Sequence, residues 1–222
     1  MTSVLFPLLS GKHPKCLILA DSITKDLYDI CHTDIITKKG ADVTRMHSYV
    51  AQNPQVVQGY NVITLHIGTN WLSKKEEWFL YLDYVNNQIN QNIFLLNLSQ
   101  LDLKPAIGQA DQFQKDFLNL INTIQYLNSK ATILISSILP RKWDFDRRDL
   151  VRQSYNSILQ NFNKLNSVYY IKTSKPFFYA INHELRSDLF NADGLHLNDG
   201  GSRVLRTILC DKIAKALQDK LK

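Results

Sequence analysis

The feature that most constrains the fold is a series of short apolar runs separated by longer segments with helical spacing. The runs predict strands at residues 15–20, 34–37, 61–67, 131–136 and 168–171. A short apolar run between polar residues is typical of a strand that is buried on both faces. The longer segments predict helices at residues 23–31, 42–52, 112–128, 150–165 and 200–221.

Strands that alternate with helices need right-handed crossover connections, and these produce a parallel sheet covered on both faces. The sequence therefore predicts the α/β class, as three α/β/α layers around a central five-stranded, mainly parallel sheet. Residues 71–99 are rich in aromatic side chains and asparagine and predict mainly helix, whereas Pro105 and Gly108 predict a loop over residues 101–110.

The length of 222 residues, with 45% hydrophobic and 21% charged residues, is ordinary for one globular domain. No linker or repeat divides the chain. We expect a single domain over residues 1–222, with its core at about 15–220 and residues 71–110 as an insertion.

The charge balance and the cysteines set broad limits on partners and compartment. A net charge of +6 permits contact with nucleic acid but does not require it. Three cysteines form no disulfide framework, which favours a reducing, cytoplasmic or otherwise intracellular location. We expect no signal peptide and no transmembrane segment, because the apolar runs are too short. The oligomeric state is left open.

Polar clusters follow the predicted strands or precede the last helix. They are Asp21-Ser22, Gly40, Gly68-Thr69-Asn70 and Asp193-Gly194-Leu195-His196. In a parallel sheet the carboxyl ends of the strands share one edge, so these clusters can meet there. Taken singly, each also has a structural explanation, since serine caps helices and glycine, asparagine and aspartate are common in turns.

The last of these clusters has the spacing of a base and its orienting carboxylate. A serine hydroxyl is a poor nucleophile until a base takes its proton. His196 has a carboxylate, Asp193, three residues earlier, and this carboxylate could orient the imidazole and stabilise its protonated form. His66 lies within a predicted strand, so we expect it to be a core histidine.

Together, the four clusters resemble the SGNH (GDSL-type) hydrolase superfamily, whose blocks occur in the same order over roughly residues 15–220. Two positions depart from that pattern. Ala20 stands where the family has a first glycine, and Trp71 follows Asn70 where the family usually has aspartate. Neither position carries the family's catalytic groups, but both can reshape the pocket.

The resemblance implies a flavodoxin-like SGNH fold and a serine esterase that hydrolyses short-chain acyl esters without cofactor or metal. It implies Ser22 as nucleophile, His196 as base and Asp193 as its partner. The oxyanion would be held by the N–H groups of Ser22 and Gly40 and by the side-chain amide of Asn70. We also expect Asp21, Trp71 and Arg141 to contact the substrate, a small-molecule, lipid or glycan ester.

A narrower resemblance concerns the esterase-type domains of LINE-like mobile elements, on residues 135–141 and 190–198. Those proteins usually add a nucleic-acid-binding segment, which is not evident here, so nucleic-acid binding is possible but unsupported. The basic residues between 141 and 152 have acidic neighbours, and a solvated charged loop is favoured over an anionic partner. The alternative function is a non-catalytic lipid-, glycan- or nucleic-acid-binding module on the same scaffold.

Overall fold

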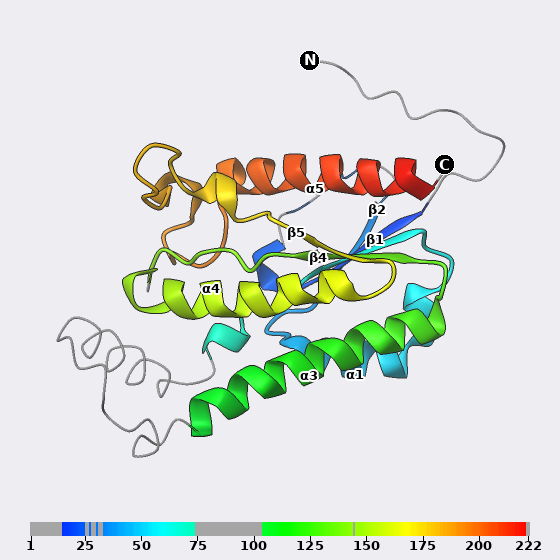
Figure 1. Cartoon of the computed structure of the whole chain (residues 1–222). Coiled ribbons are helices and arrows are strands. Elements are labelled where there is room, and N and C mark those ends of the chain that lie inside the picture. Colours follow the sequence, from blue (N-terminus) through cyan, green and yellow to red (C-terminus); the bar gives the residue numbers. More distant parts are fainter. Residues whose placement is uncertain are drawn as a thin grey trace.

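The computed structural model describes residues 15–24, 27, 30, 33–73, 104–143 and 145–220. Its centre is a five-stranded sheet in the order β2-β1-β3-β4-β5, and every pair of neighbouring strands is parallel (Figure 1). The strands are β1 (Cys16–Ala20), β2 (Thr33–Thr37), β3 (Val62–His66), β4 (Thr132–Ser136) and β5 (Val168–Ile171). The predicted α/β class and five-stranded sheet are confirmed.

Helices cover both faces of the sheet (Figure 1). One face carries α1 (Val43–Gln52), α3 (Lys104–Leu127) and α4 (Phe145–Asn161), and the other carries α5 (Asp199–Lys220). The short 3₁₀ segments are η1 (Ser22–Thr24), η2 (Pro54–Val57), η3 (Trp71–Ser73), η5 (Phe162–Lys164), η6 (Lys175–Phe177) and η7 (Ser187–Leu189).

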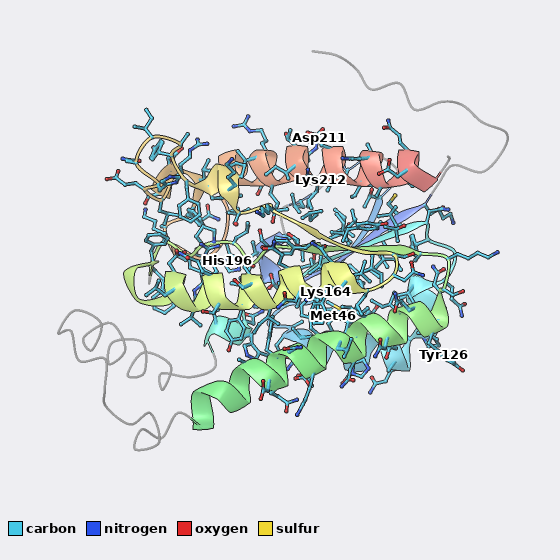
Figure 2. The ribbon with its side chains drawn as sticks, viewed as in Figure 1. Met46, Tyr126, Lys164, His196, Asp211 and Lys212 are labelled. Atoms are coloured by element: carbon cyan, nitrogen blue, oxygen red, sulfur yellow. The ribbon has the colours of Figure 1, made fainter. Side chains whose placement is uncertain are left out.

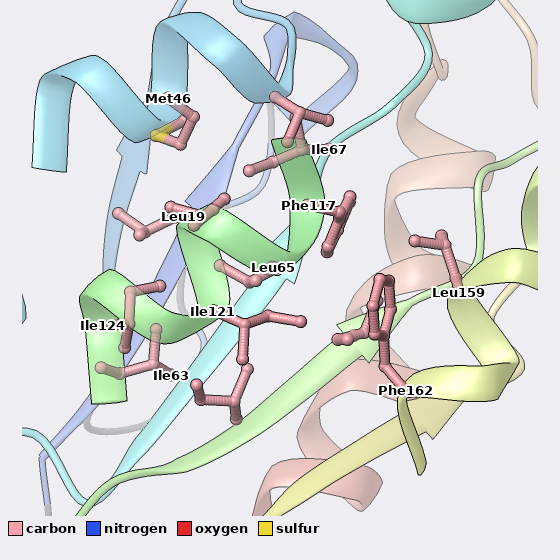
Figure 3. Close-up of a cluster of buried hydrophobic side chains, with 14 of the residues drawn as sticks. Leu19, Met46, Ile63, Leu65, Ile67, Phe117, Ile121, Ile124, Leu159 and Phe162 are labelled. Carbon is pink, nitrogen blue, oxygen red and sulfur yellow. The ribbon is translucent and has the colours of Figure 1, made fainter. Parts of the chain in front are cut away.

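The alternation of side chains along β1 explains why it is apolar throughout. Leu17 and Leu19 belong to the core beneath α1, α3 and α4, whereas Cys16 and Ile18 belong to the core beneath α5. Successive side chains of a strand point to opposite faces, so burial between two helical layers favours apolar residues at every position of the strand. Figure 3 shows the first of these cores, in which Leu19 lies among side chains of α1 and α3.

Two helices begin earlier than the sequence predicts. Residues 104–110, expected to be loop, form the first turns of α3, where Pro105 is tolerated because a proline near a helix start lacks only an N–H that would have no partner there. Gly108 inside the helix costs only about 1 kcal/mol. α4 begins at Phe145, so the last part of the expected charged loop at 142–149 is helical. Within this helix Asp149 pairs with Arg152, three residues later, at 2.6 Å, and the pair is largely buried.

Several expectations fall on residues outside the described part of the chain. The predicted helix at 23–31 begins as the 3₁₀ segment η1, and most of the rest is not described. Of the insertion at 71–110, only η3 and the start of α3 are described. The single-domain organisation with that insertion stays a prediction. In the described ranges, no helix has the length and apolar character needed to cross a membrane.

Candidate active site

Ser22 lies where β1 ends and the short segment η1 begins. One residue beyond β1, the Asp21 N–H still donates to the carbonyl of His66 at the end of β3, at 3.2 Å, and the chain then turns into η1. Ser22 is partly exposed, between the buried residues Asp21 and Ile23. Its hydroxyl therefore stands at the carboxyl edge of the sheet, as the sequence predicts.

The Asp21 carboxylate holds this turn in place from below. It is fully buried, and it accepts hydrogen bonds from the backbone N–H of Ile23 at 3.1 Å and of Thr69 at 3.3 Å. Desolvation by burial raises its pKa to about 6, although these hydrogen bonds oppose the shift. Asp21 thus ties the turn of Ser22 to the loop after β3, and its predicted contact with a substrate stays a prediction.

The structure brings Asp193, His196 and Ser22 together. His196 Nδ1 lies 2.7 Å from Asp193 Oδ2, and His196 Nε2 lies 3.4 Å from Ser22 Oγ, across 174 residues of sequence. Figure 2 shows His196 at the sheet edge, far from Tyr126 at the end of α3. With Nδ1 protonated and donating to the carboxylate, Nε2 is left as an acceptor that faces the Ser22 hydroxyl.

The charge of Asp193 is stabilised by its own loop. Desolvation acts to raise its pKa, but hydrogen bonds from the His196 side chain and from the backbone N–H groups of Leu195 and His196 outweigh it and lower the pKa to about 2. The carboxylate is therefore ionised at any pH at which a neutral imidazole exists. Its side chain is 51% exposed, whereas that of His196 is 20% exposed.

One hydrogen bond ties Asn70 to the turn that contains Gly40. The Asn70 amide donates from Nδ2 to the carbonyl of Ala41 at 2.9 Å, which joins the loop after β3 to the turn after β2. Gly40 has φ +65°, a left-handed conformation that favours glycine. One hydrogen of the Asn70 amide is thus used to anchor the loop, and its contact with an oxyanion stays a prediction.

Trp71 and Arg141, the other residues predicted to contact the substrate, lie in different surroundings. The Trp71 indole donates from Nε1 to the hydroxyl of Tyr155 in α4 at 3.2 Å, and its ring packs against Phe113. Arg141 is only 3% exposed, and its Nη1 donates to the carbonyl of Thr69 at 3.4 Å. Arg141 therefore lies beneath the loop that carries Asn70. Contact of either side chain with a substrate stays a prediction.

The loop of Asp193 and His196 is held by features that the sequence patterns did not reveal. Asn191 donates from its backbone N–H to the carbonyl of His196 at 2.9 Å, and its side chain donates to the carbonyl of Leu197 at 3.0 Å. Gly194 has φ +65°, and a Cβ there would lie 2.8 Å from the backbone nitrogen of Trp143. A glycine next to aspartate is a common turn signal, but nothing in the sequence indicated that Gly194 contacts Trp143, which follows β4.

A second histidine–serine pair lies inside the protein. His66 Nδ1 is 2.6 Å from the hydroxyl of Ser136, which is 2.7 Å from the hydroxyl of Thr173. His66 is buried, as expected of a core histidine, and burial lowers its pKa to about 4. In the described ranges, no three His, Cys, Asp or Glu side chains are grouped as metal ligands would be.

Solved structures described as an acylhydrolase, a lipase and an esterase share this fold. A protein assigned as an acylhydrolase from Bacteroides fragilis aligns over 95% of this chain and 91% of its own, with TM-score 0.65 and 12% identity. A GDSL-like lipase from Bacteroides thetaiotaomicron aligns over 91% of this chain and 88% of its own, with TM-score 0.63 and 14% identity. A carbohydrate esterase family 3 protein from Talaromyces cellulolyticus aligns over 93% of this chain and 99% of its own, with TM-score 0.57 and 13% identity. No family model and no curated protein matches the chain in sequence.

Proposed function

From the premise that this chain has the SGNH (GDSL-type) hydrolase fold, we propose that it is a serine esterase that cleaves short-chain acyl esters. The observation that carries the proposal is the row of polar atoms from Asp193 through His196 to Ser22 at the carboxyl edge of the sheet. The 3.4 Å separation of Ser22 and His196 is long for a hydrogen bond. Such contacts are often loose without substrate and tighten when it binds.

In the first half of the reaction, the Ser22 oxygen bonds to the acyl carbon while His196 Nε2 takes the hydroxyl proton. The carbonyl electron pair moves to the oxygen, which accepts hydrogen bonds from the Ser22 N–H, the Gly40 N–H and the Asn70 amide. Each preorganised donor of this kind is typically worth roughly 3–4 kcal/mol in the transition state. The bond to the alcohol half then breaks, and the alcohol leaves with the proton from His196.

In the second half, water gives a proton to His196 and attacks the acyl carbon of the acyl-enzyme. The carboxylic acid departs, and Ser22 recovers its proton. Asp193, ionised throughout, stabilises the imidazolium form of His196 in both halves. The chemistry uses only side chains and backbone N–H groups of this chain.

The test is hydrolysis of p-nitrophenyl esters of increasing acyl length by the parent protein and by Ser22→Ala, together with labelling by a fluorophosphonate probe. We expect the parent to prefer the short esters and to be labelled, and the variant to do neither. The alternative, a non-catalytic binding module, requires that the folded parent neither hydrolyses any ester nor reacts with the probe.

A further inference from the structure

Trp143 is a side chain that the proposed chemistry does not use. It follows β4 and is 60% exposed. Its backbone lies against the loop of the base, since the Lys142 N–H donates to the carbonyl of Gly194 at 2.7 Å and the Trp143 nitrogen lies 3.4 Å from the same oxygen. Gly194 stands between Asp193 and His196 in the chain. Trp143 therefore belongs to the rim of the candidate active site on the side of His196.

A buried cation fixes the Trp143 ring from the other side. The guanidinium carbon of Arg141 lies 4.9 Å from the centre of the indole, and Arg141 donates to the carbonyl of Thr69, the neighbour of Asn70. Trp143 is thus connected to two loops, through its backbone to the loop that carries His196 and through its indole and Arg141 to the loop that carries Asn70. With Arg141 over the ring, the large exposed fraction of Trp143 remains for a ligand.

We infer that Trp143 determines specificity by stacking on a ring in the alcohol half of the ester. This rests on the proposed function. His196 must give its proton to the departing alcohol, so the alcohol half lies on the His196 side of the scissile bond. Trp143 is held against the His196 loop, and therefore meets the alcohol half rather than the acyl group. An indole face packs best on another flat face, whereas a linear chain offers it less contact.

The test compares two acetate esters with seven-carbon alcohols, benzyl acetate and n-heptyl acetate. In Trp143→Ala, kcat/KM for the benzyl ester should fall about 3- to 10-fold, mainly through KM, because one aromatic contact is worth about 0.5–1.5 kcal/mol. The heptyl ester should change less than twofold. Trp143→Phe should keep most of the preference for the ring. The matched control is Tyr126→Ala, which removes an 88% exposed aromatic side chain at the far end of α3.

The outcomes separate this inference from the function on which it rests. If the parent hydrolyses neither ester and escapes the fluorophosphonate probe, both fail. If the parent is active but Trp143→Ala loses both esters equally, or neither, Trp143 has no role in choosing the alcohol and only this inference fails. An unchanged rate of probe labelling in Trp143→Ala shows that the variant still assembles Ser22 and His196.

Discussion

Two histidine–serine pairs in this protein have similar atoms and different surroundings. His66 and Ser136 are 2.6 Å apart, whereas His196 and Ser22 are 3.4 Å apart. The shorter contact belongs to the buried pair, in which the described partners of His66 include no carboxylate. In the longer one, Asp193 lies on the far side of the imidazole. A short contact therefore does not by itself indicate a nucleophile and its base.

The difference lies in what each imidazole can do with a proton. Burial lowers the pKa of His66 to about 4, so a proton taken from Ser136 would create a cation in an apolar interior. His196 has the ionised Asp193 beside it and lies at the partly exposed edge of the sheet. The buried pair satisfies polar groups in the core, whereas the proposed function assigns proton transfer to the edge pair.

Exchange of each serine for alanine gives the largest expected contrast between the pairs. Ser22→Ala should lower kcat by roughly 10⁴-fold or more and abolish fluorophosphonate labelling, because the proposed acyl-enzyme forms on the Ser22 oxygen. Ser136→Ala is the matched control, and it should keep both activities while losing stability. Labelling of Ser22→Ala at the parental rate would exclude Ser22 as nucleophile, and loss of labelling in folded Ser136→Ala would point to the buried pair.

Removal of the Asp193 charge tests the feature that separates the two histidines. Asp193→Asn should lower kcat by roughly 10³- to 10⁴-fold, because the imidazole loses both its orientation and the charge that opposes the imidazolium. Steady-state kinetics on a short p-nitrophenyl ester measures this. Asp188→Asn, which changes an exposed carboxylate paired with Arg186, is the control and should have parental rates. Parental activity in Asp193→Asn would remove Asp193 from the mechanism.

Loss of one oxyanion-hole donor should lower kcat less than loss of a triad residue. Asn70→Ala should lower kcat by roughly 10²- to 10³-fold with a smaller change in KM, because the amide acts mainly in the transition state. Asn53→Ala is matched to it, since the Asn53 amide also donates to a backbone carbonyl at 2.9 Å, in this case that of Tyr49 at the end of α1. A change confined to KM in Asn70→Ala would make Asn70 a substrate-binding residue.

The smallest effect concerns stability rather than rate. The pKa of His66 falls from 6.5 to about 4 on folding, so its contribution to stability is complete above pH 6.5 and is lost as the pH falls toward 4. Urea denaturation should show the advantage of the parent over His66→Gln shrinking by about 2 kcal/mol between pH 7.5 and pH 4.5. An advantage that does not change with pH would contradict the low pKa of His66.

The contribution of Asp21 to stability should change with pH in the opposite direction to that of His66. Its pKa rises from 3.8 to about 6 on folding, so its contribution is complete below pH 3.8 and is lost as the pH rises through 6. The advantage of the parent over Asp21→Asn should therefore grow as the pH falls from 7 to 4. In the parent the two residues oppose each other over this range, so only the variants reveal either effect.

The sheet was predictable because burial on both faces leaves β1 without a polar residue and β3 with only two, Thr64 and His66. The predicted strands at 15–20 and 61–67 differ from Cys16–Ala20 and Val62–His66 by one residue at their ends. Helix starts were less predictable, because Pro105 is a breaker inside a helix but acceptable in its first turn. Local composition does not distinguish these two positions.

In the site, the short motifs indicated which residues meet, because each stands at the end of a strand or before the last helix. Their environments could not be predicted, since they depend on contacts between distant segments. Buried Asp21 accepts a hydrogen bond from the N–H of Thr69, and buried Arg141 donates one to the carbonyl of the same residue. Trp143 lies in no motif at all, and its place at the rim follows only from the contact with Gly194.

The packing of α5 on β1 has a consequence for the order in which the chain folds. Cys16, Ile18 and Ala20 are covered by a layer that includes α5, which begins at Asp199. During synthesis, one face of β1 stays exposed to water until α5 has been made. A nascent chain that has made all five strands still exposes an apolar surface, and exposed surfaces of this kind favour aggregation. Chaperone binding should therefore be strongest in chains stopped just before residue 199.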